Sequence, residues 1–376
     1  MPASRRAVLL GTAALLGAVR AGTGSAAPAE AAGRRPFGPY GSPSVRLDSR
    51  TLYVDPAGRG DHTTLQAAVT ATGTGATAAT GWTIVLAAAT YRERVVVPPT
   101  RPYLTLLGAT RRAADTVVVL DTAAGTAKPD GAPYGTTGSA TVTLQADGLT
   151  ARDLTFANDW LRADHPETTA TQAVAVKVTG DRCAFHDCRF LGHQDTLYAD
   201  SPALSAFARQ YFDRCYVEGD VDFVFGRATA VLDRCELRTL ARDVTFTPQG
   251  FVFAPSTARA NPHGFLAQRC AFTGTAPDGA FRLARPWVPS SDTTAWPMLT
   301  VRQSVIGPGI NAPAPYADMS ASYPWQDQRF AEYADVGPGA RVTDAAERPQ
   351  LTAAQAALLT RETHLAGADG WRPWEE

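Results

Sequence analysis

Two aspartates in short motifs are the residues of this sequence best suited to hydrolytic chemistry. Asp195 lies in Gly-His-Gln-Asp-Thr-Leu-Tyr (residues 192–198), and Asp222 lies in Glu-Gly-Asp-Val-Asp-Phe-Val-Phe-Gly (residues 218–226). A carboxylate can act as a nucleophile, and a protonated carboxyl group beside it can serve as a general acid. Such a pair is sufficient for hydrolysis if the two side chains meet.

The spacing of the aspartates indicates how they would meet. They lie 27 residues apart, the same offset that separates Cys188 from Cys215. If a structural repeat has this length, Asp195 and Asp222 occupy matching places on adjacent units, and stacked strands lie about 4.8 Å apart. Like charges that close push the two pKa values apart, which leaves one carboxyl ionised and one protonated. Taken singly, each aspartate could merely cap a turn.

The surroundings of Asp222 call for a positively charged partner. Phe-Val-Phe follows it, and an unpaired carboxylate is costly to bury in an apolar segment. Arg285, in Leu-Ala-Arg-Pro-Trp (283–287), is the natural candidate. The sequence holds no Gly-x-Ser-x-Gly and no His-Glu-x-x-His, the signatures of other hydrolases. His193 is the one histidine beside these motifs, and we expect it to line a subsite or to pack rather than to catalyse.

A repeated motif indicates the fold that must position these residues. Residues 185–190, 212–217, 232–237 and 267–272 resemble one another, and their central cysteines lie 27, 20 and 35 residues apart. Short β-type runs recur from about residue 83 with no long helix between them. This pattern predicts an all-β fold, a single-stranded right-handed parallel β-helix. A β-propeller is disfavoured because the units are too short and irregular for four-stranded blades.

Two short helices are expected near the ends of the solenoid. Residues 63–69 have the Thr and Gln spacing of a capping box and predict an N-terminal helix. Residues 352–360 show the same spacing and predict a C-terminal capping helix, which we expect to cover the open end of the solenoid.

The N-terminus has the features of an export signal. Paired arginines precede an apolar run followed by small residues, so residues 1–27 are predicted to be a signal peptide, with cleavage no later than about residue 32. The paired arginines favour the twin-arginine route over an ordinary secretory signal. Residues 28–44 would form a flexible lead-in, and residues 45–376 a single domain. The protein is therefore expected to be secreted and extracellular, and the apolar run is short for a membrane anchor.

Charge and cysteine content limit the partners. Residues 1–27 hold three arginines and no acid, so the mature chain would carry 32 basic against 36 acidic residues. A mildly acidic protein is not suited to nonspecific binding of nucleic acid or anionic membranes, and neither is expected as a partner.

Five cysteines are an odd number in an oxidising compartment, so at least one is free or pairs between chains. The sequence contains no Cys-x-x-Cys motif of the zinc-knuckle type.

At these motifs the sequence resembles the pectin methylesterases, of the bacterial secreted type. Signatures of that family include Gly-x-Tyr-x-Glu, Gln-Ala-Val-Ala, Gly-aromatic-Gln-Asp-Thr-Leu-Tyr, Asp-Phe-Ile-Phe-Gly and Leu-Gly-Arg-Pro-Trp. The matching segments here, in the same order, are residues 89–93, 172–175, 194–198, 222–226 and 283–287. The resemblance extends from about residue 45 to residue 374.

Three positions depart from the family pattern. Ala89 and Ala284 stand where the family usually has glycine, and His193 replaces the usual aromatic residue. None of these departures removes a reacting group. They make the preference of the substrate-binding subsites less predictable than the chemistry.

The resemblance implies an activity and a role for each reacting residue. The activity would be hydrolysis of the C6 methyl esters of galacturonate units in pectin (methylated homogalacturonan), which releases methanol without a cofactor or metal. Asp222 would be the nucleophile and Asp195 the general acid, then base. Gln172 and Gln194 would donate hydrogen bonds to the oxyanion. Arg285 would hold Asp222 by a charge-assisted bond.

The resemblance also implies substrate contacts and a disulfide. Trp287 would line the sugar subsite together with His193, while Tyr198 and Phe225 would stack on sugar rings or simply pack in the solenoid. Cys215 and Cys235 match a disulfide pair typical of the family, and they bracket the segment of Asp222. We expect a monomer. The rival interpretations are a glycosidase or lyase built on paired carboxylates and a binding solenoid without activity.

Overall fold

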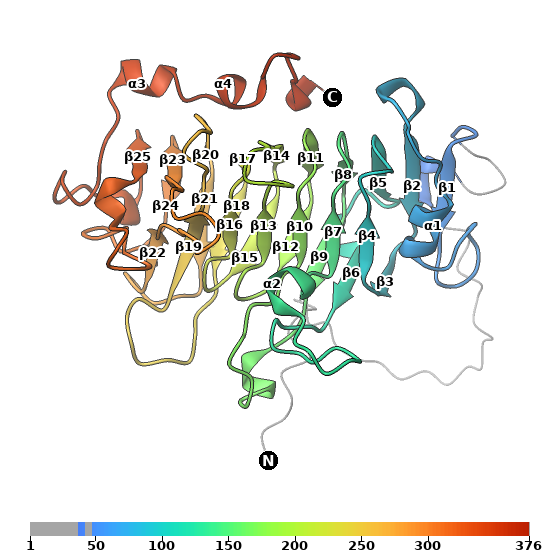
Figure 1. Cartoon of the computed structure of the whole chain (residues 1–376), viewed down its shortest axis with the longest axis horizontal. Helices are drawn as coiled ribbons and strands as arrows, with labels where there is room; N and C mark the ends of the chain where they lie inside the picture. Colours follow the sequence, from blue (N-terminus) through green and yellow to red (C-terminus); the bar gives the residue numbers. More distant parts are fainter. Residues whose placement is uncertain (1–36, 42–46, 376) are drawn as a thin grey trace, which may run out of the picture. The chain divides into compact units, whose positions relative to one another are not determined.

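Three parallel sheets build the protein, which is known here from a computed structural model that describes residues 37–41 and 47–375 (Figure 1). The predicted signal peptide lies outside the described residues. Each full coil of the chain adds one strand to each sheet; β11, β12 and β13 form one such coil, and β14, β15 and β16 form the next. This arrangement is the predicted right-handed parallel β-helix, and the prediction is confirmed.

The sheets hold ten, eight and seven strands, and every strand pair in them is parallel. The ten-stranded sheet contains, in order, β1 (Thr51–Val54), β2 (Trp82–Leu86), β5 (Leu104–Gly108), β8 (Thr150–Arg152), β11 (Cys183–His186), β14 (Arg209–Asp213), β17 (Thr229–Asp233), β20 (Phe265–Gln268), β23 (Met298–Arg302) and β25 (Arg329–Tyr333). The eight-stranded sheet contains β24 (Val305–Ile306), β21 (Ala271–Gly274), β18 (Glu236–Thr239), β15 (Tyr216–Gly219), β12 (Arg189–Leu191), β9 (Thr155–Asn158), β6 (Thr116–Leu120) and β3 (Ala89–Arg92). The seven-stranded sheet contains β22 (Phe281–Ala284), β19 (Gly250–Pro255), β16 (Val224–Gly226), β13 (Leu197–Ala199), β10 (Val176–Val178), β7 (Val142–Leu144) and β4 (Val95–Val97).

The repeated cysteine motif is the turn that leads each coil from the ten-stranded to the eight-stranded sheet. The residue before each of four cysteines has a positive φ, as at Asp187 (52°) and Arg214 (50°). That backbone conformation reverses the chain direction locally and is uncommon for residues other than glycine. Strand pairing of Arg189 with Tyr216 and of Tyr216 with Glu236 gives offsets of 27 and 20 residues. The cysteine spacing therefore measured the coil lengths correctly.

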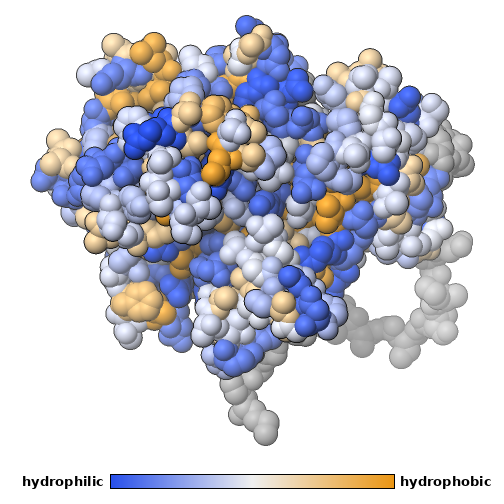
Figure 2. All heavy atoms as spheres, in the orientation of Figure 1, coloured by the Kyte–Doolittle hydropathy of each residue, from blue (hydrophilic) through white to orange (hydrophobic). Residues whose placement is uncertain are grey.

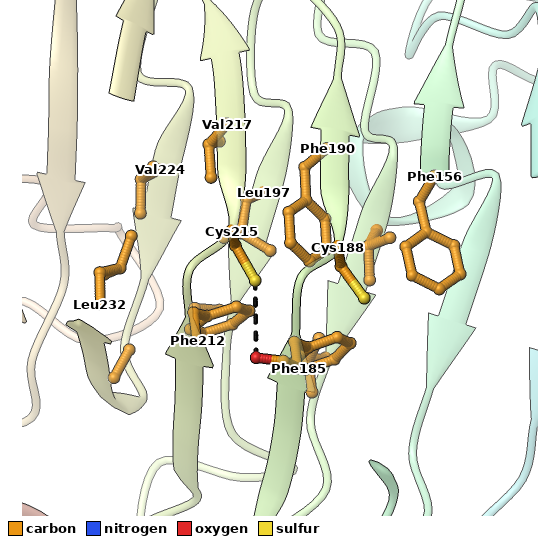
Figure 3. Packing of buried hydrophobic residues seen from close by; sticks show 14 of the residues in the cluster. Phe156, Phe185, Cys188, Phe190, Leu197, Phe212, Cys215, Val217, Val224 and Leu232 are labelled. Carbon is orange, nitrogen blue, oxygen red and sulfur yellow. Dashed lines mark hydrogen bonds between the residues drawn. The ribbon is translucent and has the colours of Figure 1, made fainter. Parts of the chain in front are cut away.

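Inside the coils, aromatic rings and thiols stack from one coil to the next (Figure 3). The rings of Phe185 and Phe212 are parallel, with centroids 4.9 Å apart. Cys215 donates from its thiol to the carbonyl oxygen of Phe185 at 3.5 Å, and Cys235 donates to the oxygen of Phe212 at 3.3 Å. All five cysteines are buried and free in this structure, so it does not contain the predicted bridge between Cys215 and Cys235.

The predicted N-terminal helix forms as α1 (Leu65–Ala71), with its cap one residue later than the expected Thr63. Thr64 caps it by accepting a hydrogen bond from the backbone N–H of Ala67. Its buried face lies against β1, β2 and β4. Residues 37–41, a part of the expected lead-in, also pack on the fold, because Phe37 is buried against the ring of Tyr53.

The prediction for the C-terminal helix was wrong in its extent and its place. Two short helices form instead, α3 (Ala353–Ala357) and α4 (Arg361–Leu365), and the chain that contains them lies along the ten-stranded sheet rather than over the open end (Figure 1). We call residues 353–375 the C-terminal strap. Leu365, Trp371 and Trp374 pack there on an apolar patch of the outer sheet face, and this patch sets the course of the strap.

The remaining helices are short and belong to loops: α2 (Gly135–Gly138), η2 (Gly38–Tyr40), η3 (Ala78–Thr80), η4 (Ala113–Asp115), η5 (Arg162–Asp164), η6 (Trp325–Asp327), η7 (Pro338–Ala340) and η8 (Pro373–Glu375). Among the described residues, no helix has the length and apolar character that crossing a membrane requires. On the face shown in Figure 2, apolar side chains gather in several small areas separated by hydrophilic ones.

Candidate active site

Asp195 and Asp222 occupy matching positions on neighbouring coils, as their spacing predicts. Each lies two residues before a strand of the seven-stranded sheet, and the pairing of Leu197 with Val224 sets the two aspartates side by side. The backbone N–H of Asp195 donates to the carbonyl oxygen of Val221 at 3.0 Å. Both aspartates have a positive φ, 66° and 51°, a conformation in which aspartate is enriched. The same local turn therefore presents both carboxyl groups.

Arg285 reaches Asp222 from the segment that follows β22. Its Nε and Nη2 donate to the two carboxylate oxygens at 2.9 and 2.7 Å. The guanidinium carbon lies 4.1 Å from the centroid of the Phe251 ring, which supports it from one face. A two-bond contact of this kind fixes the orientation of the carboxylate as well as its charge.

The two carboxyl groups have different electrostatic environments. Burial and the negative charge of Asp222 raise the pKa of Asp195 well above its ordinary value. Burial also raises the pKa of Asp222, but the hydrogen bonds from Arg285 act in the opposite direction. Arg285 binds both oxygens of Asp222, whereas no arginine or lysine among the described residues forms such a contact with Asp195. The geometry thus favours a charged Asp222 and a protonated Asp195.

A third carboxylate, which the sequence analysis did not single out, lies next to this pair. Asp220 is buried and accepts two hydrogen bonds from Arg162, at 2.6 and 2.7 Å. Nδ1 of His193 lies 3.6 Å from Asp220, so the predicted subsite histidine is part of this cluster. Burial alone would raise the pKa of Asp220, yet the bonds from Arg162 lower it, and Asp220 stays ionised beside Asp195. Its place in the motif of Asp222 was the signal that could have drawn attention to it.

Gln172 and Gln194 lie on neighbouring turns beside the aspartates. The backbone N–H of Ala173 donates to the carbonyl oxygen of Gln194 at 3.0 Å and joins the two turns. Thr171 donates from its hydroxyl to Oε1 of Gln194 at 2.6 Å, which fixes the orientation of that amide and leaves its N–H groups as donors. Both glutamine side chains are partly exposed. The amides are therefore available to a bound molecule.

The predicted aromatic residues form a wall next to the aspartates. Tyr198 and Phe225 stack with ring centroids 4.1 Å apart, and Trp287 lies 5.7 Å from Phe225 and 6.2 Å from Tyr198. Tyr198 and Phe225 are buried, whereas Trp287 is partly exposed and is the ring open to a ligand. In the part of the chain that the structure describes, no cluster of three His, Cys, Asp or Glu side chains could hold a metal ion.

Comparisons with known proteins agree with this arrangement. The family model described as Pectinesterase matches residues 51–368. A pectinesterase of Ralstonia solanacearum is 33% identical over 288 residues, which cover 68% of this chain and 72% of the relative. The solved pectin methylesterase PemA of Erwinia chrysanthemi has a TM-score of 0.75 and 28% identity, over 88% of this chain and 99% of that one.

A second solved structure extends the likeness to a protein with a bound sugar. A pectin methylesterase in complex with a hexasaccharide has a TM-score of 0.74 and 29% identity, over 85% of this chain and 97% of that chain. The family model spans both aspartate motifs, Arg285 and the whole β-helix. The chain belongs to the pectinesterase family.

Proposed function

We propose that this protein hydrolyses the C6 methyl esters of galacturonate units in pectin, with Asp222 as nucleophile and Asp195 as general acid and base. The observation that carries the proposal is the asymmetry of the pair: Arg285 binds both oxygens of Asp222, while burial and the neighbouring charge favour the proton on Asp195. Membership of the pectinesterase family supports it, as does the sugar bound to a similar solved enzyme.

The first half of the reaction forms an acyl-enzyme. A carboxylate oxygen of Asp222 attacks the C6 carbonyl carbon, and the resulting oxyanion receives hydrogen bonds from the amides of Gln172 and Gln194. The intermediate collapses with loss of the methoxy group, which takes the proton of Asp195 and leaves as methanol. Asp222 is then joined to C6 as an anhydride, and Asp195 is ionised.

The second half restores the enzyme. Asp195, now a carboxylate, takes a proton from a water molecule that attacks C6 of the anhydride. The bond between C6 and the Asp222 oxygen breaks, Asp222 returns to its contact with Arg285, and the product is a free galacturonate carboxyl. Trp287 is placed to hold the sugar ring during both steps. All reacting groups come from side chains, so the proposed route involves no cofactor.

The test is an assay of three products from highly methylated pectin. The proposal expects methanol in amounts equal to the new carboxyl groups, with no new reducing ends and no unsaturated products. New reducing ends would indicate a glycosidase and unsaturated ends a lyase. Binding of pectin without any of these products would indicate a solenoid without activity. Any of the three outcomes would contradict the proposal.

We also propose that the protein is a secreted monomer, with residues 1–27 as its signal peptide, and that export allows Cys215 and Cys235 to form a disulfide. The basic and apolar N-terminal pattern supports export. The two cysteines support the bridge because strand pairing sets them at stacked positions on adjacent coils. Non-reducing peptide mapping of exported protein should recover the linked pair. Recovery of both as free thiols would contradict the disulfide, and unprocessed protein inside the cells would contradict secretion.

A further inference from the structure

A cavity of about 380 Å³ lies beyond the aromatic wall, on the outer face of the seven-stranded sheet. Lys177 on β10, Asp200 after β13 and Arg227 after β16 line it, together with Thr137 of α2 and Thr143 of β7. We call it the Lys177–Arg227 pocket. None of its charged residues takes part in the reaction described above.

The pocket carries an excess of positive charge. Lys177 Nζ lies 3.2 Å from one oxygen of Asp200, and Arg227 Nε donates to the other oxygen at 3.1 Å. Asp200 is the one acidic residue among the described residues that line the pocket, so two cations share a single carboxylate. Asp200 is buried, and each of its two oxygens already contacts one of these cations.

Both cations keep hydrogen-bond donors that no described residue uses. Lys177 Nζ contacts Thr137 Oγ1 at 3.2 Å in addition to Asp200, and it lies 4.3 Å from the centroid of the Tyr198 ring. Arg227 uses its Nε on Asp200, whereas its terminal nitrogens make no hydrogen bond to a described residue. A guanidinium with free terminal donors beside an ammonium group suits a carboxylate ligand.

The pocket is in line with the catalytic aspartates along the sheet. Strand pairing sets Lys177, Tyr198 and Phe225 in one row, and Asp200 and Arg227 follow the ends of β13 and β16. Asp200 comes five positions after Asp195, on the far side of β13, and that length of chain spans at most roughly 16 Å. A chain of a few sugar units can span that distance, so one polymer could occupy both places.

We infer that the Lys177–Arg227 pocket binds the free C6 carboxylate of a galacturonate that is already de-esterified, while a methyl ester of the same polymer lies at Asp222. A methyl ester has no charge to place between Lys177 and Arg227. The pocket would therefore favour pectin in which free and esterified units are neighbours. This inference rests on the proposed function, because it assigns a subsite to the same substrate.

The experiment compares two hexamers of galacturonate, one unesterified and one fully methyl-esterified. Binding of the unesterified hexamer is measured by calorimetry, and kcat/KM is measured on the esterified one. Lys177→Gln and Arg227→Gln should each weaken binding of the unesterified hexamer by roughly tenfold, the effect of one charge-assisted bond. Both variants should keep kcat/KM on the esterified hexamer within about twofold. Lys177→Arg, which retains the charge, should bind the unesterified hexamer nearly as well as the unaltered chain.

The outcomes separate this inference from the proposed function. If the unaltered chain releases no methanol from the esterified hexamer, the proposed function fails. If it releases methanol but the glutamine variants bind the unesterified hexamer normally, or lose both hexamers equally, the pocket inference alone fails. A measurement on the unaltered chain serves where the variants do not fold. Its binding of the unesterified hexamer should weaken steeply with added salt, and salt-independent binding would overturn the inference.

Discussion

The catalytic pair and a histidine pair under the C-terminal strap respond to burial with opposite signs. At the catalytic pair, burial raises the pKa values of Asp195 and Asp222. Under the strap, burial lowers the pKa of His263 and lowers that of His364 to about 3. In both regions burial disfavours the charged form. The two regions differ in the charged groups that lie next to the buried side chains.

The histidine pair under the strap has no compensating negative charge among the described residues that face it. The rings of His263 and His364 lie 4.6 Å apart, and Nδ1 of His364 contacts the carbonyl oxygen of Thr360 at 2.9 Å. The charged groups that face the pair are Arg329 and Arg302, both positive, so they oppose protonation as burial does. Both imidazoles therefore stay neutral and hold the strap in place.

The catalytic pair differs because only one of its members has a cation bound to it. Arg285 contacts Asp222 with two bonds, and this asymmetry separates one base from one acid. A buried pair without such asymmetry, like the two histidines, stays in one protonation state. In the proposed mechanism, the position of a single arginine therefore decides which buried carboxyl group attacks and which one donates a proton.

The largest expected effect is the loss of the nucleophile. Asp222→Asn should lower kcat on methylated pectin by on the order of 10⁴-fold or more, since no other group can form the acyl-enzyme. Circular dichroism should show a folded protein. Asp233→Asn is the matched control, because Asp233 is also buried and bound by arginines, Arg269 and Arg361. The control should destabilise the fold by roughly 3 kcal/mol and keep the activity of the folded fraction. Equal losses of kcat in both variants would show that Asp222 is not required for the reaction itself.

The next effect concerns the orientation of Asp222. Arg285→Lys keeps the positive charge but cannot bind both oxygens in a plane. We expect kcat to fall by on the order of 10²-fold with little change in melting temperature. A steady-state assay alongside thermal melting measures both quantities. Turnover close to that of the unaltered chain would show that charge alone is sufficient.

A smaller effect is predicted at the strap, where lowering the pH should reduce the local stability of residues 353–375. The pKa of His364 is lower in the folded protein than its ordinary value near 6.5. Its contribution to stability is therefore complete above that pH and is lost as the pH falls toward about 3. Protection factors in residues 353–375, which are the intrinsic exchange rates divided by the observed ones at each pH, should fall by at most about tenfold per pH unit for each histidine in that window. His364→Phe should flatten this dependence. An equal fall in the unaltered chain and the variant would refute the role of the pair.

The smallest expected effect is a shift of the pH profile. Burial, the charge of Asp222 and then the charge of Asp220 raise the pKa of Asp195, and the proposed mechanism requires a protonated Asp195 to release methanol. Asp220→Asn removes that charge and frees the positive Arg162, so the pKa of Asp195 should fall. The alkaline limb of kcat/KM should then move to lower pH, by less than about one unit. Asp187→Asn, at an exposed pair with Arg214, is the control and should leave the limb in place. A shift to higher pH would contradict the coupling.

Much of the fold and the centre of the site could be predicted from spacing alone. A cysteine at the same turn of four successive coils gave the coil lengths, and the 27-residue coil set Asp195 beside Asp222. The same offset separates Asp200 from Arg227, so that contact was also within reach of the sequence. Residue spacing within coils carries this information because every coil stacks in register on the last.

Contacts made by segments outside the regular coils could not be predicted in this way. Arg162 reaches Asp220 from a loop after β9 that has no register with β16. The capping box of Thr352 was visible in the sequence, but the place of the strap depends on an outer patch of Tyr211, Val231 and Leu266. These three residues pair in register on successive coils, yet nothing in their spacing indicates which segment of the chain covers them.

The most direct test of the central claim is a single-turnover experiment with an aryl ester of galacturonate. An aryl oxide leaves without a proton, so Asp195→Asn should release one equivalent of it in a burst and then stall, because attack of water on the acyl-enzyme needs Asp195 as base. Asp222→Asn should give no burst. The account predicts this pair of results with both variants folded. A burst from Asp222→Asn and none from Asp195→Asn would mean that the two aspartates have the opposite roles.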